Sequence, residues 1–113
     1  MKAILVTDKQ DARRLAHGTY LHDRLTGVTY DDLVNTFGEP TFIPEDSGDG
    51  KVNFEWVFDF EEEIFTVYDW KVDQKYARYI MGRTEELQFH VGGKTYAGDF
   101  VEYIQKKVVS EVA

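Results

Sequence analysis

Alternating side chains between residues 51 and 70 constrain the fold of this chain more than any other feature. The segment KVNFEWVFDFEEEIFTVYDW places large apolar residues at every second position, with one interruption by three glutamates. A period of two is typical of strands, so the segment predicts two antiparallel strands joined near the glutamates. The first strand presents Val52, Phe54, Trp56, Phe58 and Phe60 on one face. An isolated hairpin is only marginally stable in water, so another element must cover this aromatic face.

Two helices are predicted to supply that cover. Apolar residues recur at helical spacing over residues 30–37, with Thr29 as the N-cap and Gly38 as the C-terminal cap. A second helix is indicated near the C-terminus, where one helical face would carry Phe100, Val101, Ile104 and Val108.

The remaining segments are less regular. The string ELQFHVGGK predicts a third strand that ends at two glycines. Residues 3–6 are compatible with an edge strand, and residues 11–16 with a short helix. Residues 41–51 contain proline and glycine and predict an exposed loop. Residues 71–83 predict either a short crossing helix or a mobile loop.

These elements predict an α+β fold, with an antiparallel sheet of three to four strands and two helices, one short and N-proximal and one C-terminal, packed on one face. A chain of 113 residues that is 42% hydrophobic has the size of one domain, 1–113. Its core would be residues 29–113, and residues 1–28 would form an N-terminal segment whose structure the sequence indicates less clearly. The absence of cysteine fits a reducing cytoplasm, and no apolar run is long enough for a signal peptide or a membrane span.

Negative charge is concentrated in the middle of the chain. The net charge is −8, but residues 29–70 hold twelve acidic residues against Lys51 alone, which gives this segment a charge of −11. Such a segment repels nucleic-acid phosphates and anionic lipids over about 8 to 10 Å at ordinary salt concentration. We therefore expect a partner with a basic surface, and no direct contact with nucleic acid or a membrane.

The sequence predicts no catalytic residue, no metal site and no cofactor. His17 and His22 lie five residues apart, which is not the spacing of two metal ligands on one helical face. The run Glu61, Glu62 and Glu63 falls at an expected turn, where solvated charges are the ordinary arrangement. We therefore expect that the protein is not an enzyme.

The string HVGGK offers a second kind of candidate site. Adjacent glycines and a lysine before a helix could hold a small anion, although the Walker spacing is absent and a simple strand-to-helix turn is the alternative. The candidate ligand-binding residues are Arg78, Arg83, His90, Gly92, Gly93 and Lys94.

The strings TYDDLVNTFGEPT, GDGKVNFEWVFDFEEEIFTVYDWK and HVGGKT, followed by a final helix, resemble small proteins predicted in tailed-bacteriophage genomes and prophages. The resemblance covers roughly residues 29 to 108 and depends on the combination of GEPT, KVxxEW, YDWK and HVGGK. It implies a phage accessory protein that acts in the cytoplasm of the host bacterium. It implies no catalytic residues.

Charge and resemblance together give three hypotheses for function. The first is a non-enzymatic inhibitor that binds a host defence or nucleic-acid-processing factor through an acidic surface that imitates nucleic acid. The second is a small-molecule binder that sequesters a nucleotide signal of host immunity through the HVGGK region. The third is a virion structural or assembly protein, and a homodimer is left open by the sequence.

The acidic surface of the first hypothesis comprises Glu45, Asp46, Asp49, Glu55, Asp59, Glu61, Glu62 and Glu63. Within it, Glu55 and Asp59 are expected to point into solvent, because they alternate with the aromatic residues of their strand.

Overall fold

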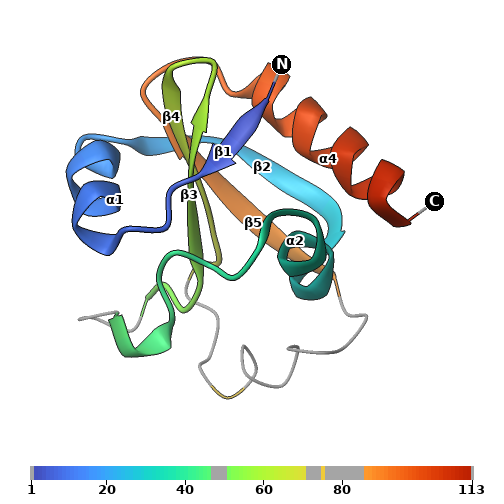
Figure 1. Ribbon diagram of the computed structural model, residues 1–113, viewed down its shortest axis with the longest axis horizontal. Coiled ribbons are helices and arrows are strands. Elements are labelled where there is room, and N and C mark those ends of the chain that lie inside the picture. Colours follow the sequence, from blue (N-terminus) through green and yellow to red (C-terminus); the bar gives the residue numbers. More distant parts are fainter. Residues whose placement is uncertain (1, 47–50, 71–74, 76–85, 113) are drawn as a thin grey trace.

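The computed structural model describes residues 2–46, 51–70, 75 and 86–112 (Figure 1). Within them, the elements in chain order are β1 (Ala3–Leu5), α1 (Lys9–Ala16), β2 (Tyr20–Thr29), α2 (Tyr30–Phe37), the 3-10 turn η1 (Pro44–Asp46), β3 (Glu55–Phe60), β4 (Glu63–Tyr68), β5 (Glu86–Gly93) and α4 (Gly98–Val112). The five strands form one antiparallel sheet in the order β1-β3-β4-β5-β2. The predicted α+β class is confirmed, with a slightly larger sheet than expected.

The strand that the sequence analysis missed is β2, which pairs with β5. Its apolar residues do not alternate strictly, because the register shifts between Leu21 and Asp23 and again between Leu25 and Val28. Gly27, in the second shift, has a φ of 78°, a conformation that glycine adopts without steric cost. Bulges of this kind conceal a strand from any search for a period of two.

The predicted hairpin is present as β3 and β4, in a register that pairs Trp56 with Val67. The turn consists of Glu61 and Glu62, whose φ angles of 53° and 68° lie in the left-handed region. Two-residue turns of this hand match the twist of a hairpin, but they usually contain asparagine and glycine. The two glutamates are therefore held in a conformation that their side chains disfavour.

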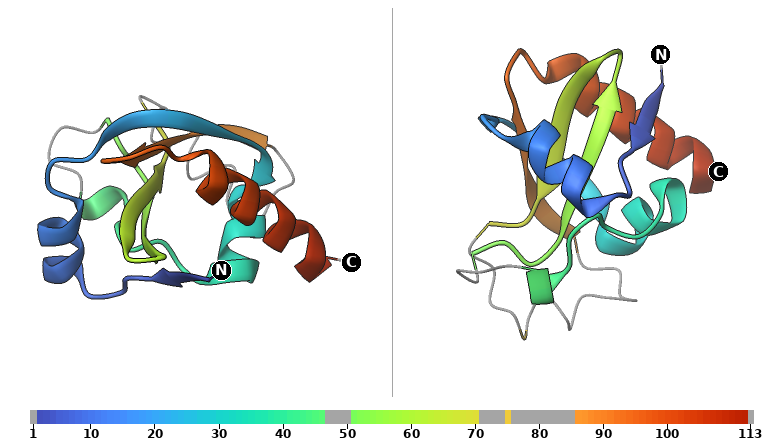
Figure 2. Two further views of the ribbon diagram at one scale, coloured as in Figure 1. Left: turned by 90° about the horizontal axis from the view of Figure 1, so that it is seen from above. Right: turned by 60° about the vertical axis from the view of Figure 1, so that its left-hand side comes forward.

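One face of the sheet, called the inner face, carries Trp56, Phe58 and Phe60 and packs against α2 and α4. Phe100 of α4 stacks on Phe65 with 4.8 Å between the ring centroids, and it lies 5.5 Å from the ring of Phe58. Figure 2 shows α4 running along this side of the sheet. The prediction that helices cover the aromatic face is confirmed.

Helix α2 has the predicted bounds, and its N-terminus is stabilised as the sequence indicated. The backbone N–H of Asp32 donates to Thr29 Oγ1 at 3.0 Å, and the N–H of Thr29 donates to Asp32 Oδ2 at 2.9 Å. This reciprocal pair is a capping box. At the other end of the helix, the ring of Phe37 lies 5.1 Å from that of Phe58, which ties α2 to the sheet.

The opposite face, called the outer face, carries Val57 and Thr66 at its centre and is covered there by α1. Val57 is completely buried, Thr66 is 1% exposed, and Ala12 of α1 is also completely buried. Figure 2 shows α1 and α4 on opposite sides of the β3–β4 hairpin. The edge strand and the short helix expected near the N-terminus are both present, and the helix provides a second layer that the sequence analysis did not assign to it.

Part of the segment predicted as an exposed loop is also packed. Phe42 forms two backbone hydrogen bonds with Glu55, of 3.0 and 3.1 Å, so it lies beside the start of β3, on the edge with which β1 also pairs. Thr41 and Pro44 are buried, and η1 follows. The expectation of an exposed loop is wrong for Thr41, Phe42 and Pro44, whereas Ile43 and Glu45 are exposed as expected. Residues 47–50, like most of 71–83, lie outside the described residues.

Replacing Trp56 with alanine is expected to lower the free energy of unfolding by roughly 3 to 5 kcal/mol. Trp56 is completely buried, contacts Tyr30 and Phe89 through its rings, and donates its indole N–H to the Gly38 carbonyl at 3.0 Å. Urea denaturation measures the loss, and Trp70→Ala is the matched control, because that side chain is 41% exposed. Equal stability of the two variants would contradict the assignment of Trp56 to the core.

Candidate functional site

The acidic residues of the predicted binding surface lie at two ends of the sheet. Glu45 and Asp46 belong to η1, which follows directly on the segment paired with Glu55 at the start of β3. Residues 61–63 lie beyond the other end of the same strand. Six residues of strand separate the two groups, a length of about 17 to 20 Å. Asp49 lies outside the described residues.

Lysines from the N-terminal segment lie among these carboxylates. Lys9 Nζ is 2.7 Å from Asp46 Oδ2, and this hydrogen-bonded pair lowers the pKa of Asp46. Lys2 lines a surface hollow together with Asp59, Glu61 and Glu62. The carboxylates therefore form two smaller groups, each with a cation beside it, instead of one continuous acidic surface.

The expectation that Glu55 points into solvent is wrong. Its side chain is half-buried on the outer face, because the segment around Phe42 pairs against β3 at this point. Burial, and secondarily the charge of Asp69, raise the pKa of Glu55 to about 7. Asp59 is half-buried too, and its Oδ1 accepts a hydrogen bond from the Glu62 backbone N–H at 3.1 Å.

The glycines of HVGGK do not form a phosphate-binding loop. Gly92 and Gly93 lie within β5 and pair with residues of both β4 and β2. A Cβ atom at Gly92 would lie 2.6 Å from Thr66 Oγ1, and one at Gly93 would lie 2.8 Å from the Phe65 ring. Both positions are glycine because neighbouring side chains occupy that space. Lys94 is exposed just after the strand, and Arg78 and Arg83 lie outside the described residues.

The structure assembles a different group of side chains on the outer face. The registers of β3, β4, β5 and β2 pair Glu55 with Tyr68, Tyr68 with His90, and His90 with Arg24. Paired residues share a face of the sheet, so these four side chains form a row across four strands. The row joins a carboxyl group, a phenol, an imidazole and a guanidinium group.

Three aromatic rings cluster at the middle of this row. The ring of His90 lies 5.6 Å from that of Tyr68 and 6.3 Å from that of Trp70, with which it is stacked. Tyr68 and Trp70 contact each other edge to face at 6.4 Å. We call these residues the aromatic triad. Trp70 is 41% exposed, whereas Tyr68 and His90 are half-buried, so the triad presents an aromatic surface to solvent.

The local electrostatics keep the triad uncharged at neutral pH. Burial, and secondarily the nearby Arg24, lower the pKa of His90, which favours the neutral imidazole. Burial, and secondarily Glu55, raise the pKa of Tyr68. Arg24 provides the positive charge at the β2 end of the row, and its side chain is exposed.

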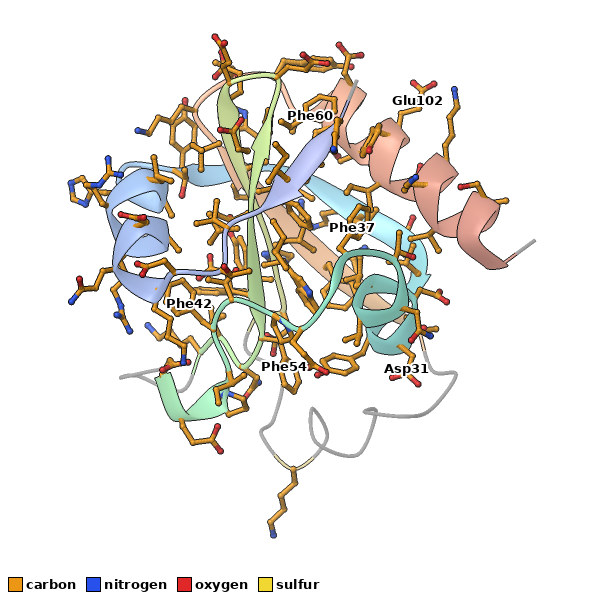
Figure 3. All side chains as sticks on the ribbon, viewed as in Figure 1. Asp31, Phe37, Phe42, Phe54, Phe60 and Glu102 are labelled. Carbon is orange, nitrogen blue, oxygen red and sulfur yellow. The ribbon has the colours of Figure 1, made fainter. Side chains whose placement is uncertain are left out.

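A pocket of about 160 Å³ opens at the other end of the row. It is lined by Arg13, Phe42, Ile43, Asp46, Val52, Asn53 and Glu55. The Arg13 guanidinium lies over the Phe42 ring at 5.0 Å, a cation–π arrangement that holds the guanidinium in place. Figure 3 shows Phe42 on the side of the molecule where α1 lies. We call this the Glu55 pocket, because Glu55 belongs both to it and to the row.

Asp69 holds the wall of this pocket in position. Its completely buried carboxylate accepts hydrogen bonds from the backbone N–H groups of Asn53 and Phe54, at 2.8 and 2.7 Å, and from Asn53 Nδ2 at 2.7 Å. These bonds fix the residues just before β3 against the end of β4. Consequently, a compensated buried charge lies next to Glu55, whose own carboxyl group is desolvated.

Sequence reasoning identified only part of this site. Glu55 and His90 were named, but in two different hypotheses, and Arg13 and Arg24 were not considered. The signal for Tyr68 and Trp70 was the alternation in YDWK, which places both rings on one side of their strand. The contact with His90 depends on the pairing of β4 with β5, which no local pattern specifies.

No three histidine, cysteine, aspartate or glutamate residues of the described part of the chain lie close enough to hold a metal ion. None of its helices combines the length and the apolar character needed to cross a membrane. Comparison with protein-family models, curated proteins and solved structures gives no match to this chain.

The pKa of Glu55 predicts an unusual dependence of stability on pH. A carboxyl group whose folded pKa is raised from 4.5 to about 7 binds more protons in the folded state, so stability is lost as pH rises between these values. Glu55→Gln removes this penalty. We expect its free energy of unfolding to exceed that of the wild type by up to about 3 kcal/mol at pH 8, and by little at pH 4.5.

Urea denaturation at several pH values measures this difference. Glu102→Gln is the control, because its ion pair with Lys106 at 2.6 Å lowers the pKa of Glu102, so its contribution has the opposite sign. A constant difference between Glu55→Gln and wild type from pH 4.5 to 8 would show that Glu55 titrates normally.

Proposed function

We propose that the protein is a non-enzymatic binding protein that takes up a small planar heterocycle, of the nucleotide class, on the outer face of its sheet. The observation that carries this proposal is the aromatic triad, in which Trp70 stacks on His90 and remains 41% exposed. Large aromatic side chains usually bury most of their surface, and aromatic rings that stay accessible on a sheet are a common platform for bases.

The chemistry of the site favours a small ligand over a polymer. Stacking of a base on an aromatic side chain contributes about 1 to 3 kcal/mol, and it does so for every base because each base has a flat aromatic face. Arg24 at the end of the row offers one positive charge for a phosphate group. The net charge of −8 opposes binding of a long phosphate chain, because such binding requires many cations.

The resemblance to phage accessory proteins supports a biological role for such a site. A phage protein that binds nucleotides without converting them would sequester a nucleotide signal of host immunity in the bacterial cytoplasm. This is the second hypothesis from the sequence, transferred from the glycines of HVGGK to the triad and the Glu55 pocket. Only His90 is common to both versions of the site.

Replacing Trp70 with alanine is expected to weaken nucleotide binding at least about fivefold, because one stacking surface is lost. Trp70→Phe should retain most of the affinity. Isothermal titration with AMP, GMP, CMP and UMP measures the effect, and quenching of tryptophan fluorescence reports it independently, because Trp56 is completely buried.

Tyr96→Ala is the matched control, since Tyr96 is an aromatic residue that is 77% exposed and follows β5 outside the row. It should bind as the wild type does. Two results would reject the proposal: equal binding by Trp70→Ala and Tyr96→Ala, or equal affinity for ribose 5-phosphate and the nucleotides.

The acidic hairpin tip supports a second candidate function, the inhibition of a basic host protein. Glu61 and Glu62 occupy left-handed positions where asparagine and glycine would cost less, and Glu63 is exposed beside them. A function at the exposed tip can explain why residues that disfavour this backbone conformation are found there. This candidate uses the tip alone, because the carboxylates at the other end of β3 are about 17 to 20 Å away.

Changing residues 61–63 together to glutamine should then weaken binding to the host protein and flatten its dependence on salt concentration. Exposed carboxylates attract a basic surface through screened interactions, so added salt competes with them. Capture from host lysate at 50 and 300 mM salt, followed by titration of the captured protein, tests this. Unchanged affinity in the triple variant would exclude the hairpin tip as the contact.

A further inference from the structure

We propose that the Glu55 pocket selects the base of the ligand, and that it selects a guanine-type edge, in which a ring N–H and an amino group lie side by side next to a carbonyl oxygen. This inference depends on the proposed function, because it assigns the edge of a ligand that the triad stacks. It adds a ligand class and names the residues that recognise it.

The pocket presents one acceptor that has no donor of its own. Among the described residues, no side chain donates a hydrogen bond to the Glu55 carboxyl group, although Phe42 pairs with its backbone. Because the carboxyl group lines an open pocket, it can bond to water, and a ligand that displaces this water has to supply donors in its place. An ionised carboxylate only accepts hydrogen bonds, so two adjacent donors on a planar base suit it.

Arg13 supplies the complementary donor. It lines the same pocket, and its position over the Phe42 ring restrains the guanidinium plane. Arginine donates readily to the carbonyl oxygen and ring nitrogen of guanine. Adenine presents an amino donor beside a ring acceptor, so it would direct an acceptor at Glu55 and lose one of the two bonds.

The size of the pocket fits the edge of a base. An engineered cavity of about 150 Å³ holds one benzene ring, so a volume of about 160 Å³ accepts one six-membered ring. Because Glu55 and Tyr68 are paired neighbours on adjacent strands, the other ring of the base would lie over Tyr68, the member of the triad next to the pocket.

The groups around Glu55 predict how the selection responds to pH. Asp69 and Tyr68 lie near Glu55 on the β4 side. Arg13 of α1 and Asp46 of η1 line the same pocket, and Lys9 compensates the charge of Asp46. Two donors from the ligand favour the ionised carboxylate, so the ligand must displace a proton from Glu55 at pH 6 but not at pH 8.

Titration calorimetry with GMP, IMP and AMP at pH 6, 7 and 8 tests the proposal. We expect GMP to bind at least about tenfold more tightly than AMP, with IMP, which lacks the amino group, in between. The GMP affinity should rise about tenfold from pH 6 to pH 8, beyond any change for AMP, which carries the same phosphate. Glu55→Gln should abolish both the preference and the additional pH dependence.

A pair of neighbouring arginines gives a matched control. Arg13→Ala should weaken GMP binding, whereas Arg14→Ala should not, because Arg14 is exposed, lies 3.6 Å from Asp11 and does not line the pocket. Circular dichroism verifies that each variant is folded.

The possible failures are distinguishable. If GMP and AMP bind equally but Trp70→Ala weakens both, stacking is supported and the selection by Glu55 is overturned. Retention of the GMP preference in Glu55→Gln also overturns it. If no nucleotide binds to the wild type, the proposed function and this inference both fail.

Discussion

The register of the β3–β4 hairpin is the constraint on which the rest of this structure depends. Pairing Trp56 with Val67 directs the tryptophan and phenylalanine residues of both strands to the inner face, where α2 and α4 bury them. The same register pairs Glu55 with Tyr68 on the outer face. A slip of one residue would exchange the two faces, exposing the core and burying the row of polar side chains. Stability and the candidate site therefore have a single structural origin.

The outer face contains one desolvated carboxyl group that hydrogen bonds compensate and another that they do not. Asp69 is buried but accepts three hydrogen bonds, which is a stable arrangement for a carboxylate. Glu55, next to it, is desolvated without equivalent bonds, and its raised pKa expresses that cost. A desolvated acid that lines a pocket is typical of a functional site, since hydrophobic packing alone would favour an apolar residue there.

Charge alone proved a poor guide to where the carboxylates lie in space. Twelve acidic residues within residues 29–70 predict one negative surface, but the fold places the named carboxylates at both ends of β3 and brings Lys9 to Asp46. Sequence proximity within a hairpin does not imply proximity in space, because a strand separates its ends by about 3.3 Å per residue. Of the carboxylates named for that surface and described by the structure, residues 61–63 at the tip remain a compact acidic group.

The sequence by itself determined the elements that local physics encodes. The hairpin follows from alternation, α2 from its capping box, and α4 from its apolar face, because each signal lies within a few consecutive turns or strand residues. Tertiary structure alone decided the position of β2, whose bulges break the alternation, and the cover that α1 provides. It also decided the site. Tyr68 and Arg24 are the neighbours of His90, and strand pairing brings them to it across long stretches of chain.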